Sequence, residues 1–244
     1  MARPLVSVIL PVKNGERFLA QAMSSVVDQD YRPLEIVVVD GQSTDGSAAI
    51  AQSFDLVRYV YQQGELGLGR ARNLGIEAAR GELIAFINSD DLWAINKLSL
   101  QVDYLARHPE VQFTITRAKF FLEPGSDIPS GFRRELLEGD YVAEMPEALV
   151  ARKSLFAQLG GFDPQLALCD DVDWFARARD QDVSMAVIPE ALVLRRIHEG
   201  SLSFGASSGA DYGSEMLRAL RRSIDRRRGM KRAGDTTEVG GDAE

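Results

Sequence analysis

The chain has 244 residues, of which 45% are hydrophobic and 26% charged, as is typical of a globular protein with a sizeable core. Its net charge of -8 argues against a general nucleic-acid-binding protein. The single cysteine, Cys169, excludes an intrachain disulfide framework, and no apolar run approaches the roughly 20 residues of a membrane span. The first residues lack the pattern of a signal peptide, so we expect a cytoplasmic protein.

The first hundred residues alternate between strand and helix patterns. We predict strands at 5–10, 34–39, 56–61 and 83–87, and helices at 16–27, 45–54, 67–80 and 93–107. Strand–helix alternation with short connections implies an α/β fold, in which helices cover both faces of a mainly parallel central sheet.

The second half is less regular. We predict one or two strands within 111–122, a loop-rich stretch at 123–139, helices at 152–159 and 171–181, and strand material at 183–194. A basic amphipathic helix follows at about 214–228, and the polar residues from 233 onwards are predicted to be disordered. The predicted organisation is therefore a main domain at 1–205, a basic helical extension at 206–232 and a disordered tail at 233–244.

Polar or Gly-rich segments follow the four predicted strands of the first half, at 11–16, 40–46, 67–73 and 88–91. In open α/β sheets, ligands bind beyond the carboxyl ends of the strands. We therefore predict a nucleotide site at this edge, in which Asp40 bonds a base or a ribose. The alternative for Asp40 is a local Asx turn or a helix cap.

Asp90 and Asp91 are adjacent carboxylates after an apolar strand, and their mutual repulsion needs compensation. A hard divalent cation, Mg²⁺ or Mn²⁺, commonly takes one or two carboxylates together with substrate phosphates. We therefore predict that Asp90 is a metal ligand. The alternative is a solvated turn that caps the next helix, a role that suits Asp91.

Gly67 and Gly69 match part of a dinucleotide fingerprint, but Arg72 stands in place of its third glycine, which disfavours a Rossmann dehydrogenase. At the start of a helix, Arg70 and Arg72 are candidate partners for a diphosphate. The alternative is that both are ordinary surface arginines.

Together these segments resemble family 2 glycosyltransferases of the GT-A fold. The resemblance runs in order through about residues 5–205 and rests on VSVILPVKNGERFLAQAMSSVVDQDYRPLEIVVVDGQSTDGS, GLGRARNLGIEAARGELIAFINSDDLW, GGFD, CDDVDWFARA and RRIHEGSLS. It implies an inverting transfer from a nucleotide-sugar donor, usually UDP-linked, with a divalent cation. Residues 1–92 are then the nucleotide-sugar-binding half of the domain and residues 93–205 the acceptor-binding half.

The resemblance also implies roles for individual residues. Pro11, Val12 and Glu16 line the nucleoside pocket, and Asp40 binds the base. Residues 88–90 are the DxD motif, with Asp90 on the metal and an asparagine in place of the commoner first aspartate. The predicted donor contacts are Pro11, Val12, Asn14, Glu16, Asp40, Gly67, Arg70, Arg72, Asn88, Ser89 and Asp90.

Asp170, Asp171 and Asp173 form a second acidic cluster before a predicted helix. Sugar transfer to a hydroxyl needs a carboxylate that accepts the proton, and the family has its base where this chain has Asp171. The alternative is a helix start favoured by the macrodipole, which explains one acidic residue more readily than three. In the family, a histidine at the position of His198 completes the metal site or contacts the diphosphate. The alternative is a packed surface histidine.

The sequence thus predicts a metal-dependent, hexosyltransferase-type enzyme, and the missing QxxRW signature of processive synthases predicts single transfers. Its acceptor is a hydroxyl that the sequence does not identify, with cell-envelope and exopolysaccharide glycans as candidates. Two alternatives stay open, an inactive nucleotide-sugar-binding protein and a nucleotidyltransferase. The basic stretch 218–232 suits peripheral contact with an anionic membrane, a cover over the acceptor lobe, or a homodimer contact.

Overall fold

The computed structural model describes residues 3–129, 132–198 and 208–237. Within these residues one nine-stranded sheet has the order β3-β2-β1-β4-β8-β6-β9-β5, and β7 pairs with β6 beside this path. The strands are β1 (Val6–Val12), β2 (Leu34–Asp40), β3 (Val57–Tyr61), β4 (Leu83–Phe86), β5 (Leu92–Trp93), β6 (Phe113–Leu122), β7 (Tyr141–Val142), β8 (Val150–Arg152) and β9 (Met185–Ile197). The helices are α1 (Leu19–Val27), α2 (Ser47–Gln52), α3 (Leu68–Ala78), α4 (Lys97–Arg107), α5 (Lys153–Leu159), α6 (Asp170–Asp180) and α7 (Ser208–Thr237), with 3₁₀ turns η1 (Arg134–Leu137) and η2 (Pro146–Ala148).

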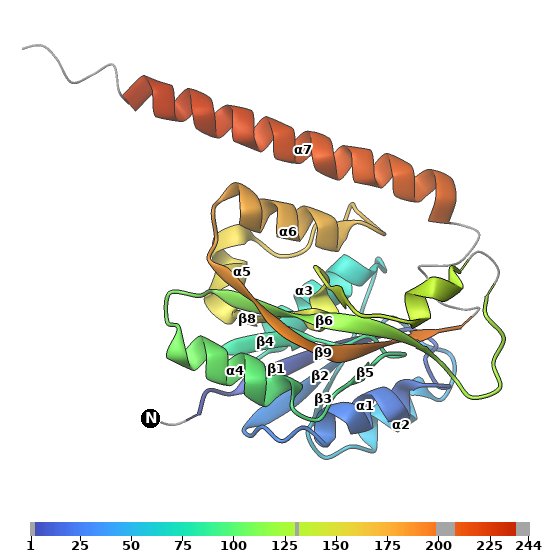
Figure 1. Ribbon diagram of the computed structural model, residues 1–244. Coiled ribbons are helices and arrows are strands. Elements are labelled where there is room, and N and C mark those ends of the chain that lie inside the picture. The colour runs from blue at the N-terminus through green and yellow to red at the C-terminus, as the bar shows by residue number, and fades with distance from the viewer. Residues whose placement is uncertain (1–2, 130–131, 199–207, 238–244) are drawn as a thin grey trace, which may run out of the picture.

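Strands β3, β2, β1 and β4 are parallel, and every residue of β1 is buried. A strand covered on both faces reads as a continuous apolar run, which is why β1, β2 and β4 were predictable. In Figure 1, α1 and α2 lie on one side of the sheet and α3, α5 and α6 on the other. The predicted α/β fold with helices on both faces is confirmed.

The second half of the sheet is mixed. Strand β8 pairs antiparallel with both β4 and β6, β9 runs parallel to β6, and β5 runs antiparallel to β9. The sheet therefore continues from the predicted nucleotide-binding half into the predicted acceptor-binding half.

An aromatic cluster fixes the start of α6 on this sheet. Trp174 is fully buried and stacks on Phe156 of α5, with ring centroids 5.2 Å apart. Its indole also meets the edge of Phe113 on β6, at 5.7 Å. Because Trp174 lies one turn into α6, this packing anchors the acidic first turn of that helix.

Two element boundaries differ from the sequence predictions. The predicted helix at 93–107 begins only at Lys97, because Leu92 and Trp93 pair with Leu194 and Val193 of β9 instead. The basic helix spans Ser208–Thr237, so it enters the tail that was predicted to be disordered from residue 233. Residues 199–207, at the predicted domain end, and 238–244 lie outside the described residues. None of the described helices is long and apolar enough to cross a membrane.

Candidate active site

The predicted donor edge begins with the turn after β1 and the loop after β2, which are bonded to each other. The Asn14 side-chain oxygen accepts a hydrogen bond from the Thr44 amide at 2.8 Å. The Glu16 carboxylate accepts one from the Gly46 amide at 2.9 Å. Asn14 and Glu16 are exposed at this edge, so the two strand ends form one continuous rim. Pro11 and Val12, also predicted as donor contacts, are buried at the end of β1.

Asp40 ends β2 and is only 1% exposed. One carboxylate oxygen accepts a hydrogen bond from the Ser43 amide at 2.7 Å, and the other accepts one from the Tyr59 hydroxyl at 2.5 Å. Burial, together with the bond to the Asp40 carboxylate, raises the pKa of Tyr59 to about 12. Asp40 therefore makes the local Asx-turn contact that was the alternative to nucleotide binding. Its contact with a nucleobase stays a prediction.

Arg70 and Arg72 occupy opposite sides of α3. Gly67 is exposed just before this helix, and the Arg70 side chain is 41% exposed and pairs with the exposed Glu65 at 2.9 Å. Arg72 is only 4% exposed. Residues two positions apart in a helix differ by about 200° around its axis, so one side chain faces solvent when the other faces the interior.

Arg72 is not the surface arginine of the alternative interpretation, because its guanidinium is buried and bonded inside the protein. One terminal nitrogen donates to both oxygens of Asp170, at 3.0 and 2.8 Å, and the other donates to Glu147 at 3.2 Å. Its donors are thus used by two buried carboxylates, and its contact with a diphosphate stays a prediction.

The turn after β4 carries residues 88–91, the predicted DxD motif and the aspartate that follows it. A side chain on Gly15 would have its Cβ 3.1 Å from the Ser89 hydroxyl oxygen, so this turn lies directly against the turn after β1. The Asn88 amide donates to the Asp91 carboxylate at 3.2 Å. Three predicted donor segments therefore meet at one edge of the sheet.

Asp91 is 2% exposed and accepts a hydrogen bond from the Arg196 amide at 3.0 Å. Burial, reinforced by the neighbouring Asp90 charge, raises the pKa of Asp91 to about 8. The suggestion that Asp91 caps the next helix is wrong, because α4 begins at Lys97 and the intervening residues pair with β9. Asp91 instead ties the turn to the end of β9.

Asp90 and His198 meet at the same edge. The His198 Nε2 atom lies 3.0 Å from a carboxylate oxygen of Asp90, and both side chains are partly exposed. The His198 ring also packs beside Phe18, with centroids 4.9 Å apart. The structure therefore brings together the two residues predicted as metal ligands, although they are 108 positions apart in the sequence.

The donor set of this pair fits a divalent cation. Carboxylate oxygens suit Mg²⁺ and Mn²⁺, and histidine is the commonest metal ligand among side chains. Mg²⁺ usually completes its shell with phosphate oxygens and water. Among the described residues, no group of three His, Cys, Asp or Glu side chains forms a metal cage by itself. A cation held by Asp90 and His198 would therefore take its remaining ligands from the donor diphosphate and water.

Asp171 lies in the first turn of α6 and is half-buried. Burial is the largest cause that raises its pKa to about 6; the positive charge of Arg72 opposes the shift, and the negative charges of Asp170 and Glu147 add to it. A carboxyl group that loses its proton near pH 6 is well matched to accept one from a hydroxyl at neutral pH.

Glu147 is a buried residue of this site that the sequence did not indicate. It lies in η2, is 3% exposed and bonds Arg72. Its charge acts on Asp91 at the donor edge and on Asp171 at the start of α6. Glu147 therefore lies between the two acidic clusters, and no local pattern marks it.

Lys97 is a second buried residue that the sequence analysis missed. Its side chain is fully buried, and the ammonium nitrogen lies 4.0 Å from the centre of the Trp93 ring. Burial holds the pKa of Lys97 well below its usual range, while the Glu147 charge acts in the opposite direction.

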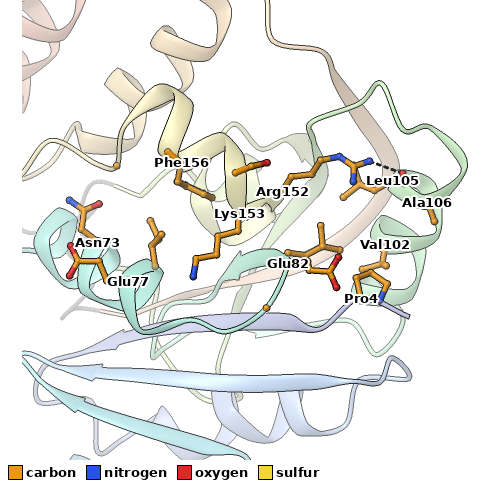
Figure 2. Close-up of a pocket in the computed structure, with 16 residues that line it drawn as sticks. Pro4, Asn73, Glu77, Glu82, Val102, Leu105, Ala106, Arg152, Lys153 and Phe156 are labelled. Atoms are coloured by element: carbon orange, nitrogen blue, oxygen red, sulfur yellow. Dashed lines mark hydrogen bonds between the residues drawn. The ribbon is translucent and has the colours of Figure 1, made fainter. Parts of the chain in front are cut away.

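A groove of about 1120 Å³ lies elsewhere in the molecule, between α3, α4 and α5 (Figure 2). It includes Pro4, Leu83 and Arg152, which lie at the opposite ends of the strands from the donor edge. No predicted site residue lines it. The groove is therefore separate from the candidate active site.

Sequence comparison identifies the class to which this fold and site belong. The profile of Glycosyl transferase family 2 matches residues 7–155, so the chain belongs to this family. An uncharacterised glycosyltransferase of Rickettsia typhi is 29% identical over 213 residues, covering 80% of this chain and 65% of its relative. TuaG of Bacillus subtilis, named for teichuronic acid biosynthesis, is 32% identical over 130 residues, covering 52% of this chain and 51% of its own. The chain thus spans about half to two thirds of the length of these relatives.

Solved structures share the fold. TarS of S. aureus in complex with UDP gives a TM-score of 0.69 at 21% identity, covering 90% of this chain and 65% of TarS. The mannosyltransferase PcManGT from Pyrobaculum calidifontis, with GDP-Man and Mn²⁺, gives 0.68 at 23% identity, covering 92% and 65%. The predicted glycosyltransferase fold is confirmed.

Proposed function

We propose that this chain is an inverting, metal-dependent glycosyltransferase that makes single transfers from a nucleotide-sugar donor, with UDP as the nucleotide, to a hydroxyl acceptor. The family membership supports transfer from a nucleotide sugar. The observation that carries the proposal is the presence of two sites of different chemistry. Asp90 and His198 form a partly exposed ligand pair, while Asp171 is a carboxyl with a pKa of about 6.

The two sites divide the chemistry between them. A divalent cation held by Asp90 and His198 would stabilise the charge that develops on the leaving diphosphate. Asp171, when ionised, accepts the proton of the acceptor hydroxyl as its oxygen forms the new bond to the anomeric carbon. The nucleophile and the leaving group then lie on opposite faces of the sugar, and this geometry inverts the anomeric centre.

The donor pocket is proposed from the rim residues. Asn14, Glu16 and Arg70 are exposed or partly exposed there and can meet the nucleoside and the diphosphate. Neighbours with this fold were solved with UDP, UDP-GlcNAc or GDP-Man, which supports a nucleoside diphosphate as the recognised group. We keep UDP as the proposed nucleotide.

A donor screen tests the proposal. The purified protein is incubated with UDP- and GDP-sugars, with and without Mn²⁺, and nucleotide release is measured with candidate acceptors. We expect metal-dependent release with one donor, and Asp171→Asn should abolish transfer while leaving UDP binding intact. Tight UDP–Mn²⁺ binding without turnover of any donor would favour an inactive binding protein. Release of pyrophosphate from a nucleoside triphosphate would favour a nucleotidyltransferase.

We also propose that the outer face of α7 rests on an anionic membrane surface. The inner face is used internally, since Arg226 and Arg227 pair with Asp180 of α6 at 3.0 and 2.6 Å. On the outer face Leu217, Leu220 and Ile224 are about half exposed, at 58%, 49% and 50%. Their spacing forms one stripe along the helix. Figure 1 shows α7 lying over α6 at the outside of the molecule.

Charge favours a membrane over a second copy of the helix. Arg218, Arg221 and Arg228 are exposed and form no ion pair with another described residue, while Asp225 is the exposed acidic residue among them. Two such helices packed along this stripe would bring arginines of one copy close to arginines of the other, and these charges would repel each other. Anionic lipid headgroups would instead attract the arginines. This placement suits an envelope glycan acceptor, as the relative named for teichuronic acid biosynthesis also suggests.

Vesicle flotation tests the membrane proposal. The protein should float with phosphatidylglycerol vesicles, should not float with phosphatidylcholine vesicles, and should dissociate as salt rises. Replacing Leu220 and Ile224 by serine should abolish flotation, whereas Val142→Ser, at an exposed apolar residue of β7, should not. Equal flotation of all variants, or a concentration-dependent dimer lost in the serine variant, would overturn the proposal.

A further inference from the structure

Three charged side chains form a buried cluster under the candidate active site, which we call the arginine clamp: Arg72, Asp170 and Glu147. They are 4%, 2% and 3% exposed. Arg72 donates hydrogen bonds to both oxygens of Asp170, at 3.0 and 2.8 Å, and to Glu147 at 3.2 Å. The clamp joins α3, α6 and η2, three elements far apart in the sequence.

Stability alone is a poor reason for such a cluster. Desolvating buried charges costs about as much as their attraction returns, and packed apolar residues of similar volume often serve as well or better. The clamp also contains two carboxylates for one guanidinium, so its own charges do not balance. Its geometry is more informative than its strength, because a two-pronged arginine contact fixes a carboxylate in both position and orientation.

The carboxylate that the clamp fixes belongs to the residue beside the proposed base. Asp170 begins α6, and Asp171 follows it. A Cβ on Gly69 would lie 3.0 Å from an Asp170 carboxylate oxygen, so the start of α3 already presses against this side chain. With Trp174 buried one turn later, the first turn of α6 is held from both sides.

We propose that Glu147 is a positioning residue for proton transfer: it holds Arg72 against Asp170 and thereby sets the orientation and the electrostatic surroundings of Asp171. The inference rests on the proposed function of Asp171 as the base. Glu147 lies in a segment without a motif, and its role depends on contacts rather than on a sequence pattern.

The charges that face Asp171 determine in which direction its pKa should change when Glu147 is replaced. Arg72 faces it from α3, Asp170 from its own helix and Glu147 from η2, and the thiol of Cys169 precedes the pair. The negative charges of Asp170 and Glu147 disfavour ionisation of Asp171, and the positive charge of Arg72 favours it. Removing the charge of Glu147 should therefore lower the pKa of Asp171 and extend activity to lower pH.

The test is Glu147→Gln, which keeps an oxygen for Arg72 and removes the charge. We expect kcat to fall by up to about 100-fold through misplacement of the base, with the donor KM unchanged. The acid-side midpoint of the kcat profile, expected near pH 6 in the unmodified protein, should move to lower pH. Glu147→Asp, which restores the charge, should return the midpoint toward pH 6.

Asp180→Asn is the matched control. Asp180 is another carboxylate of α6 with a fully buried side chain, and it pairs with α7 rather than with the clamp. It should lower thermal stability without moving the acid-side midpoint. If Glu147→Gln does not fold, Arg72→Lys, which keeps the charge but loses the planar fork, should show the same loss of kcat at constant donor KM.

The proposal would be overturned by a Glu147→Gln pH profile that superposes on that of the unmodified protein, or by a midpoint shift of the same size in Asp180→Asn. A loss of activity in Glu147→Gln that comes entirely from a raised donor KM would also contradict it. An unmodified protein without transferase activity would instead refute the proposed function, so the two failures are distinguishable.

Discussion

Arg70 and Arg72 lie two residues apart in α3. Replacing each by methionine compares the loss of an exposed arginine with the loss of a buried one. Methionine keeps a long apolar side chain and removes the charge. In Arg72→Met, the carboxylates of Asp170 and Glu147 remain buried without their cation. Removing one partner from a buried ion pair costs about 3–5 kcal/mol. The exposed Arg70–Glu65 pair contributes about 0–1 kcal/mol.

The two variants therefore differ by several kcal/mol in the free energy of unfolding. For a chain of this size, each kcal/mol shifts the melting temperature by roughly 2–4 °C, so Arg72→Met should melt about 6–20 °C lower. Arg70→Met should melt within about 4 °C of the unmodified protein. Urea unfolding followed by circular dichroism measures both free energies, and calorimetry measures the melting temperatures.

Donor kinetics complete the comparison. Assayed well below its melting temperature, Arg72→Met should keep the donor KM, because the buried guanidinium of Arg72 is already bonded to Asp170 and Glu147. Arg70→Met should raise the donor KM, since Arg70 is the proposed diphosphate contact. Equal stability of the two variants, together with a raised donor KM in Arg72→Met, would refute this reasoning and support the predicted diphosphate contact of Arg72.

Further outcomes follow from other parts of the structure. The kcat of transfer should fall as pH drops through about 6, because Asp171 must be ionised to accept a proton and its pKa is raised to about that value; a rate that stays constant between pH 5 and 8 would contradict this. Gly161→Ala should lower the free energy of unfolding by about 2 kcal/mol, because its Cβ would lie 2.3 Å from the Asn73 side-chain oxygen and break two hydrogen bonds of that amide. Gly139→Ala, with no atom within 4 Å of the added Cβ, should change it by less than about 0.5 kcal/mol, and equal effects in denaturant titrations would count against the steric reasoning. His198→Ala should raise the Mn²⁺ concentration needed for half-maximal nucleotide release, and an unchanged metal titration would remove His198 from the metal site.

The first half of the fold was predictable because its signals are local. Apolar runs mark β1, β2 and β4, and the polar segments after them belong at one edge of a parallel sheet by topology alone. The contacts between the turns after β1, β2 and β4 are therefore found where the sequence placed them.

The second half depended on contacts that local sequence does not carry. Strand β5 consists of Leu92 and Trp93, and it forms only because β9, about a hundred residues later, offers a partner. The bond between Arg72 and Glu147 spans 75 positions. Helical phase does indicate that Arg70 and Arg72 cannot both face the same ligand, but it does not tell which of them faces inward.

The arginine clamp has a consequence for any attempt to make this protein more heat-resistant. Buried ion pairs can often be replaced by packed apolar side chains with no loss of stability, and sometimes with a gain. A laboratory selection on survival at high temperature alone would thus have no reason to retain Arg72, Asp170 and Glu147. Such a selection would yield heat-stable variants that keep the fold but have lost transfer activity. A selection that alternates heating with a transfer assay would keep the clamp.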